Sequence, residues 1–542
     1  MLATGTEGKR LGGRHRSKPW LGIGPLLHLS DIPGGRYVLG MGMHRSLVIC
    51  VALVGAGCGR ETSGPPLPPG TRVGYYVTPA GTSAGDGSDA DPWSLSYALG
   101  GAGGQVNPGD TIWVRGGTYS GIFTSTLAGS AAAAIIVKGY PGERAIISGN
   151  SSSNTLKIDG TYTWFWGLEV QVGTTSRTSL RQDAVYVRDA SHVKLIHLLV
   201  HDGGSGIYTE PTSTDVEIYG CVIYNNGYQA DASDRGHGHA IYIKNNTGTK
   251  LVRDNVMFNQ FGFGLHQYSS LGSGSLVGIT FKGNVAFNNG ALAIAGTSQA
   301  GNLLAGGEEV VSAAVADSNL TYYSSTVTGM VANFKLGFQS TQNAGVLARG
   351  NLSVGGDPVF DMRLWATATV SGNTWVGSAI LVNLADTSDA GYTWSNNTNW
   401  RDPTASAWRF ANGSASTFAN FRTASGLAAT DTAIAGTPAV TQVFVRPSVY
   451  QPGLGFVVVY NWGAQGTAAA NVAGILTNGD PYEVRSVQNL FGSAVASGTY
   501  GGGTIAIPLG AVTPPTPLGM ASSPAPVTGP AFDVFVVTRV TP

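Results

Sequence analysis

Short apolar strands separated by glycine-containing turns recur through the middle of the chain. Four ten-residue segments align without gaps, and they are Val193–Asp202, Val216–Asn225, Lys250–Asn259 and Ile279–Asn288. Weaker copies follow at 346–356 and 369–378. Equivalent positions in the four copies lie 23, 34 and 29 residues apart, and 22 residues separate the two weaker copies. A repeat of about 22 residues with insertions predicts a parallel β-solenoid, in which each repeat adds one rung.

One position of the repeat is rich in asparagine. Along the six copies it reads Leu198, Cys221, Asn255, Asn284, Asn351 and Asn373. Asparagine at the same place in successive rungs predicts a stack of side-chain amides at a bend, each bonded to its neighbours. Cys221 occupies this position, so we expect a buried, structural thiol. A reactive cysteine would need an exposed, electropositive setting.

A second short strand precedes each repeat. These strands are 156–159, 185–188, 207–210, 241–244 and 265–268. Their first and third residues are mostly apolar and are expected to face inward, because side chains alternate along a strand. The residues left facing outward form two columns, Lys157, Tyr186, Tyr208, Tyr242 and His266 beside Asp159, Arg188, Glu210, Lys244 and Tyr268. Successive rungs lie about 4.8 Å apart, so neighbours in a column can contact one ligand together.

The pattern changes near residue 435. Alternating strands separated by Gly/Pro turns predict an antiparallel β-sandwich over 433–542 that either binds glycan or only caps the solenoid. Its Pro-rich segment, 512–530, is expected to be a long exposed loop. The solenoid itself is expected over 73–432, with almost no helix beyond a cap near Ser94–Leu99.

Composition narrows the class of protein. Glycine accounts for 79 of 542 residues and charged residues for only 11%, which disfavours a helical bundle. Lys+Arg and Asp+Glu number 31 each, so bulk charge gives no reason to expect a nucleic-acid partner. Three cysteines are too few for a disulfide scaffold. We therefore expect an all-β protein, and a monomer.

The N-terminal region predicts export. Residues 43–58 have a basic start, an apolar run too short to span a bilayer, and small residues before Cys58. This layout resembles a lipoprotein signal, with lipidation at Cys58 and anchoring at the cell surface or in the periplasm. Plain secretion and a buried strand are the alternatives. Residues 1–42 are interpreted as upstream of the true start, and 59–72 as a Pro-rich tether.

The chain resembles the right-handed parallel β-helix proteins of the pectate-lyase-like superfamily. The resemblance rests on the opening segment 75–119 (YYVTPAGTSAGDG…GGTY) and on the rungs at 235–268 (RGHGHAIYIK…GLHQY), and it covers roughly 75–430. It implies the fold and a carbohydrate ligand or substrate outside the cell. It leaves the activity open, because the superfamily holds lyases, hydrolases, epimerases and adhesins.

The longest rung carries an insertion at 228–240 that concentrates chemically versatile side chains. These are Asp231, Asp234, Arg235, His237 and His239. Loops on a rigid scaffold often carry function. The histidines and aspartates could act on substrate, hydrogen-bond locally, or ligate a metal such as Ca²⁺.

The outward columns and the insertion together favour β-elimination from a uronic-acid polymer. Lys244 or Arg235 would hold the sugar carboxylate, and His239 or His266 would take the proton. Tyr208 or Tyr242 would protonate the leaving oxygen. Further substrate contacts are expected from Arg188, Glu210, Tyr186 and His237.

Three other interpretations remain open for these residues. The columns could be a solvated stripe of weak ion pairs. Hydrolysis by paired carboxylates would draw on Asp202, Glu210 and Asp234, although Asp202 occupies the turn position of Asn225 and is expected to be structural. A non-catalytic surface protein that binds glycan is the third.

Overall fold

The structure is a computed structural model that describes residues 74–150, 152–294, 297, 299–325, 332–386 and 391–540. The chain divides into two compact units, Met1–Arg60 and Glu61–Pro542, and every described residue belongs to the second. The predictions made for residues 1–72, including lipidation of Cys58, lie outside the described residues and stay predictions.

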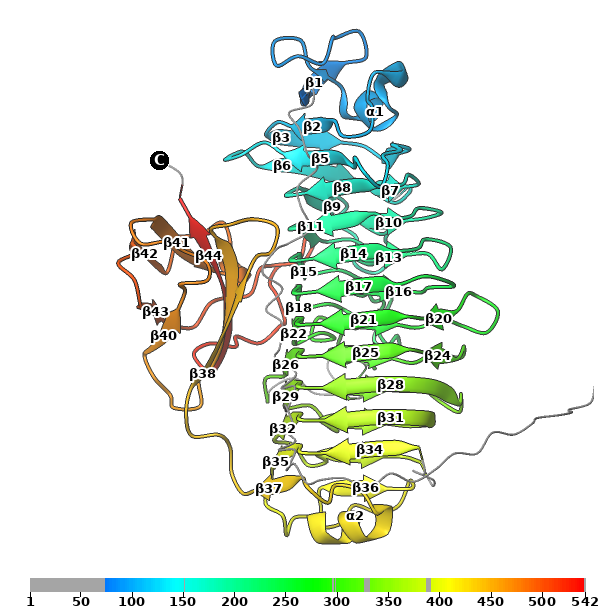
Figure 1. The fold of residues 1–542 in the computed structure, drawn as a ribbon, viewed down its shortest axis with the longest axis vertical. Helices are drawn as coiled ribbons and strands as arrows, with labels where there is room; N and C mark the ends of the chain where they lie inside the picture. Colours follow the sequence, from blue (N-terminus) through cyan, green and yellow to red (C-terminus); the bar gives the residue numbers. More distant parts are fainter. Residues whose placement is uncertain are drawn as a thin grey trace, which may run out of the picture. The chain divides into compact units, whose positions relative to one another are not determined.

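Three long parallel sheets build the solenoid, and their strands lie one above another in successive rungs (Figure 1). The first sheet contains β1 (Gly74–Thr82), β2 (Thr111–Val114), β5 (Ile135–Gly139), β8 (Thr163–Trp166), β11 (Lys194–Ile196), β14 (Val216–Tyr219), β17 (Lys250–Arg253), β21 (Ile279–Lys282), β25 (Ala314–Asp317), β28 (Asn343–Arg349), β31 (Trp365–Ser371) and β34 (Tyr392–Ser395). The second contains β4 (Phe123–Ser125), β7 (Leu156–Ile158), β10 (Val185–Val187), β13 (Ile207–Thr209), β16 (Ile241–Ile243), β19 (Leu265–Gln267), β23 (Leu303–Ala305), β27 (Phe334–Leu336), β30 (Phe360–Met362), β33 (Val382–Leu384) and β36 (Trp408–Phe410). The third contains β3 (Gly117–Ser120), β6 (Ala145–Gly149), β9 (Glu169–Val172), β12 (Leu199–His201), β15 (Val222–Tyr224), β18 (Val256–Phe258), β22 (Val285–Phe287), β26 (Leu320–Tyr322), β29 (Leu352–Val354), β32 (Thr374–Val376), β35 (Thr398–Trp400) and β37 (Thr432–Ile434).

The aligned repeats correspond to successive rungs, as predicted. Leu195 pairs with Ile218, and Ile218 with Val252, in the parallel register that the gap-free alignment requires. The inward residues of the preceding strands are buried, with Val185, Ile207 and Ile241 all 0% exposed. These side chains form the solenoid's core, which accounts for the apolar first and third positions of those strands.

The asparagine ladder is present and longer than the sequence suggested. It comprises Asn255, Asn284, Asn319, Asn351, Asn373 and Asn397, all buried. At each step a side-chain oxygen accepts from the backbone amide of the preceding rung, as Asn284 Oδ1 does from Asn255 (3.1 Å), and the side-chain Nδ2 donates to a carbonyl such as Val252 O (2.9 Å). Asn319 belongs to a rung, β25–β26, that the sequence comparison missed.

Cys221 begins this ladder and is fully buried, as predicted. Its backbone amide donates to Asn255 Oδ1 (2.9 Å), and its sulfur lies 3.6 Å from Leu195 O, the carbonyl to which an asparagine here would donate. Burial raises the pKa of the thiol to about 12.

We therefore expect Cys221→Asn to be tolerated, with the free energy of unfolding within about 1 kcal/mol of the parent. Denaturant unfolding checks this, with Asn284→Ala as the control that should be clearly destabilised because it leaves buried ladder groups unpaired. Rapid modification of folded parent protein by a bulky thiol reagent would contradict the buried position.

Short helices close the ends of the solenoid. The helix α1 (Leu95–Leu99) matches the predicted cap and is followed by the 3₁₀ turn η1 (Ala102–Gly104). A second helix, α2 (Phe418–Ser425), was not expected; Phe418 and Phe421 are buried and join the solenoid core at its other end. The last rung strand, β37, extends to Ile434, slightly beyond the predicted boundary at 432.

The C-terminal part is antiparallel, as predicted. A five-stranded sheet contains β38 (Gln442–Pro447), β39 (Leu454–Tyr460), β44 (Phe532–Arg539), β41 (Pro481–Ser486) and β42 (Ala496–Thr499). A two-stranded sheet contains β40 (Thr467–Asn471) and β43 (Thr504–Pro508), and η2 (Val487–Asn489) is a 3₁₀ turn. No helix among the described residues is long and apolar enough to cross a membrane.

The C-terminal sandwich packs on the third sheet of the solenoid. Val256, Phe258 and Phe287 share one apolar cluster with Val458 and Phe532, and all five side chains are fully buried. The contact removes the outward face of these rungs from water, which explains why this part of the third sheet carries apolar residues on both faces.

Candidate functional site

The outward column of the second sheet has the predicted register. Tyr186 pairs with Lys157 on one side and with Tyr208 on the other, and Tyr242 pairs with Tyr208 and His266. The Tyr208 and Tyr242 rings stack at a centroid distance of 4.8 Å with an interplanar angle of 16°. The side chains of adjacent rungs are therefore in direct contact.

A pocket of about 480 Å³ opens where this column meets the 228–240 insertion. We call it the histidine pocket. It is lined by Arg235, His239, Tyr242, Phe263, His266, Tyr268, Ser270, Gln299, Leu304, Phe338 and Gln339. Four residues predicted as catalytic or substrate-binding, namely Arg235, His239, Tyr242 and His266, thus meet in one cavity.

His239 is held as a neutral hydrogen-bond donor. Its Nδ1 accepts from the backbone amide of Phe263 (3.0 Å), so the proton of the neutral ring is on Nε2. Burial lowers its pKa to about 3, and the charges of Arg235 and His237 act in the same direction. At neutral pH this imidazole can therefore donate from Nε2 and is poorly suited to accept a proton.

His266 lines the pocket next to His239. Its ring lies 4.0 Å from that of His239 between centroids, and only 6% of the residue is exposed. Nδ1 is buried and has no hydrogen-bond partner among the described residues. Burial, helped by the charges of His239, Arg235 and Lys244, lowers its pKa well below the usual value. The ring is thus neutral at physiological pH and flanked by Phe263 and Tyr268, which stack on it.

Tyr242 and Arg235 also line the pocket. Burial raises the pKa of Tyr242, so its phenol stays protonated, and its hydroxyl has no hydrogen-bond partner among the residues described. Arg235 is exposed and lines the pocket mouth, with no carboxylate of the described residues paired to it. A protonated phenol, a neutral imidazole and a guanidinium therefore converge here.

Apart from Tyr268, which lines the pocket and stacks on His266, the other predicted column residues lie outside the pocket lining. Lys244 is buried rather than solvent-facing, and its Nζ donates to Ser273 O (3.2 Å) and lies 5.4 Å from the Tyr242 ring centroid. Glu210 accepts a short hydrogen bond from the Tyr186 hydroxyl, and Arg188 pairs with Asp159 (2.9 Å). Among the described lining residues, Tyr208 contacts Tyr242, on which its ring stacks.

Contacts within the 228–240 insertion stabilise its conformation. His237 Nε2 lies 2.7 Å from Asp234 Oδ1, and its ring stacks on Tyr228. Asp231 is exposed and accepts from the Ser233 amide and hydroxyl. Among the described residues no group of three or more His, Cys, Asp or Glu side chains is placed to hold a metal ion. A role for Ca²⁺ stays a prediction.

Sequence inspection missed Lys335, which continues the outer column beyond His266. Leu304 pairs with His266 on one side and with Lys335 on the other. Lys335 Nζ is 3.4 Å from Asp361 Oδ2 and 5.4 Å from the Phe338 ring, which is a wall of the pocket. Burial lowers its pKa, although Asp361 opposes the shift. The sequence does carry a signal for this position, because Lys335 is a polar residue between the apolar Phe334 and Leu336, as expected for an outward-facing side chain.

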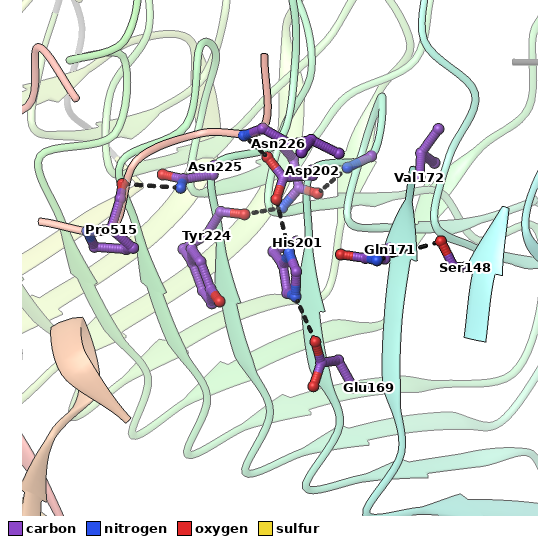
Figure 2. A network of polar contacts seen from close by, with 12 residues as sticks. Ser148, Glu169, Gln171, Val172, His201, Asp202, Tyr224, Asn225, Asn226 and Pro515 are labelled. Atoms are coloured by element: carbon purple, nitrogen blue, oxygen red, sulfur yellow. Dashed lines mark hydrogen bonds and ion pairs between the residues drawn. The ribbon is translucent and has the colours of Figure 1, made fainter. Parts of the chain in front are cut away.

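A second polar cluster lies on the third sheet, on another face of the solenoid (Figure 2). His201 lies between Glu169 (3.0 Å from Nε2) and Asp202 (2.7 Å from Nδ1), and all three are buried. Burial alone would lower the pKa of His201, but the hydrogen bonds and charges of both carboxylates outweigh it and raise the pKa to about 9.

The Pro-rich segment 512–530 is a loop without helix or strand, as predicted, but it is exposed only in part, because it also binds to this cluster. Asp202 accepts from the Leu518 amide (2.8 Å) and forms a short ion pair with Arg177. Asn225 donates to Pro515 O (3.0 Å), as Figure 2 shows. Asp202 also has the left-handed backbone (φ 59°) of Asn225 (φ 56°), which confirms its structural role at the turn.

Several solved structures are similar to this chain but share little sequence with it. A rhamnogalacturonan lyase is 17% identical with a TM-score of 0.49, over 60% of this chain and 87% of that one. The pectate lyase Pel9A is 18% identical with a TM-score of 0.41, over 63% and 78%. An alginate lyase from Paenibacillus sp. str. FPU-7 is 18% identical with a TM-score of 0.36, over 63% and 96%.

No curated protein matches the chain. The model of the Pel9A-like right-handed β-helix region, in contrast, matches residues 75–362, which is more than half of the 542 residues. The matched range contains the asparagine ladder up to Asn351 and the whole histidine pocket. The chain therefore belongs to the Pel9A-like right-handed β-helix family.

Proposed function

We propose that the protein is an exported polysaccharide lyase that cleaves a uronic-acid-containing polymer by β-elimination in the histidine pocket. The observation that carries this proposal is the chemistry of the pocket lining: Arg235, His239, Tyr242 and His266 line it, and no described Asp or Glu does. Hydrolysis by the usual mechanism needs two carboxylates across the scissile bond, whereas elimination needs a base, an acid and a carboxylate partner.

Each role in the elimination is assigned to one residue of the histidine pocket. Arg235 holds the sugar carboxylate at the pocket mouth. His266 takes the proton from C5, and the electron pair forms the C4–C5 double bond as the C4–O bond breaks. Tyr242, protonated because burial raises its pKa, donates to the leaving oxygen. His239 donates from Nε2 and so stabilises negative charge that develops on the sugar.

Lys335 is the alternative base. It lies two rungs from His266 in the same column, and burial lowers its pKa toward the range useful for proton transfer. Its ion pair with Asp361 holds the amine in the protonated form, so we assign the proton transfer to His266 first.

We expect at least one acidic polysaccharide to yield an unsaturated product that absorbs in the ultraviolet. The test is a panel of polygalacturonate, alginate and rhamnogalacturonan, each incubated with and without a chelator. The comparison with and without chelator shows whether the activity needs a divalent cation such as Ca²⁺. If no polymer is cleaved under either condition, the lyase proposal fails and non-catalytic glycan binding takes its place.

A further inference from the structure

A second cavity, of about 720 Å³, lies at the edge of the contact between the solenoid and the C-terminal sandwich. We call it the interface cavity. Tyr322, Asp357 and Ser378 line it from the solenoid, and Tyr460 and Trp462 line it from the sandwich. None of these residues takes part in the histidine pocket. Cavities between domains with aromatic walls and a few polar groups are typical small-ligand sites.

The aromatic rings of the cavity are held in fixed positions. The Trp462 ring stacks on Tyr460 (5.9 Å, 13°), and its indole N–H donates to Gln442 Oε1 (3.3 Å). Tyr322 stacks on Phe532 (4.5 Å, 6°). Trp462 and Tyr322 are both only half-buried, so part of each ring remains open to the cavity. Rigid, partly exposed rings present flat apolar surface at little entropic cost.

The charge of the lining is opposite to that of the histidine pocket. Asp357 is exposed; its Oδ1 accepts from the Ile380 amide (2.9 Å), and Oδ2 has no partner among the described residues. No Lys or Arg of the described chain lines the cavity, whereas Arg235 lines the histidine pocket. A free carboxylate oxygen accepts hydrogen bonds from hydroxyl groups and repels another carboxylate.

The geometry points to a second carbohydrate site here, one that binds neutral sugars. A pyranose ring offers an apolar C–H face for Trp462 and Tyr322 and hydroxyl groups for Asp357 and Ser378, which are the groups the cavity supplies. A uronate would bring its carboxylate against Asp357, with no Lys or Arg among the described lining residues to offset the repulsion. The sandwich would thus hold a neutral part of a glycan while the histidine pocket, on another face of the solenoid, acts on charged sugar.

Isothermal titration calorimetry of the full chain tests binding. The neutral ligands are xylo-oligosaccharides and galacto-oligosaccharides, and oligogalacturonate is the charged ligand for comparison. We expect a neutral oligosaccharide to bind, and Trp462→Ala to weaken that binding at least tenfold. Trp400→Ala is the matched control, because Trp400 packs against the same apolar cluster without lining the cavity, and it should bind like the parent. Trp462→Phe should retain binding within a few-fold.

Asp357→Lys, at an exposed position, should shift the preference toward oligogalacturonate without a change in folding. The proposal is overturned if no neutral oligosaccharide binds, if the parent prefers oligogalacturonate at this cavity, or if Trp462→Ala and Trp400→Ala bind like the parent. None of these readouts depends on turnover. They therefore stand even if the lyase proposal fails, and a failure here leaves that proposal intact.

Discussion

Replacing His266 by glutamine is expected to lower kcat/KM on the cleaved polysaccharide by at least about 100-fold. General-base catalysis by a positioned side chain typically contributes about 10²- to 10⁴-fold. Glutamine keeps most of the volume and hydrogen-bonding capacity of a residue that is only 6% exposed, but it cannot accept the proton. Initial rates of formation of the unsaturated product measure the effect, and the circular dichroism spectrum should match the parent.

His237→Gln is the matched control for His266→Gln. The substitution is again histidine to glutamine. His237 lies in the 228–240 insertion close to the pocket, but its ring is hydrogen-bonded to Asp234 and does not line the pocket. We expect its turnover within a few-fold of the parent. Loss of activity in Lys335→Ala together with normal turnover in His266→Gln would move the proton transfer to Lys335.

The pH dependence of the parent enzyme gives an independent check on His266. Burial lowers the pKa of its imidazole, so the basic form persists below the ordinary pKa of about 6.5 and is lost only as pH falls further. The acid limb of the kcat/KM profile should therefore lie below pH 6.5. A profile that falls off well above that pH would indicate a different base.

The fold could be predicted because its signals are local and repeated. Rung spacing, alternation in short strands and asparagine at one position each point to the same solenoid, and the register of Leu195, Ile218 and Val252 agrees. The rung with Asn319 was not identified from the sequence, because the residue types of its strands, Ala314–Asp317 and Leu320–Tyr322, match the repeat poorly. Backbone pairing and the ladder bond to Asn351 hold it in place instead.

The site could be predicted only in part, because closure of the pocket depends on distant segments. Alternation placed Tyr242 and His266 on the outer face correctly. It could not show that Phe338 and Leu304 form the far wall, nor that a Phe263 amide fixes the tautomer of His239. Lys244 is buried, and its Nζ donates to the carbonyl of Ser273 in a loop, a contact that strand periodicity does not reveal.

The composition of the Pro-rich segment likewise did not indicate that it docks on the solenoid. Proline-rich sequence predicts an exposed loop, yet Leu518 offers both its amide and its carbonyl to buried partners on the solenoid. Arg177 is the central partner. It donates to Leu518 O (2.8 Å), to Asn225 O (3.0 Å) and to Gly227 O (2.9 Å), and it pairs with Asp202.

Arg177→Met is therefore expected to destabilise the docked segment by about 3–5 kcal/mol, as for other broken buried ion pairs. The change leaves the buried Asp202 without one counter-charge and leaves three carbonyl groups without their donor. Because multidomain proteins seldom unfold in one step, the sharper measurement is hydrogen exchange at the Leu518 amide, which donates to Asp202. At about 1.4 kcal/mol per tenfold, exchange there should accelerate by at least about 100-fold.

Arg188→Met provides the comparison for Arg177→Met, since it removes an arginine that pairs with Asp159 at the surface. Its side chain is 41% exposed, and Asp159 keeps its ion pair with Lys157 (3.1 Å), so the stability should change little. If exchange at Leu518 in Arg177→Met stays at the parental rate, the Pro-rich segment is held by its apolar contacts alone, such as Ala525 on Phe261 and Leu292. An accelerated rate in Arg177→Met with a parental rate in Arg188→Met would assign the docking to the buried network of Arg177, Asp202 and His201.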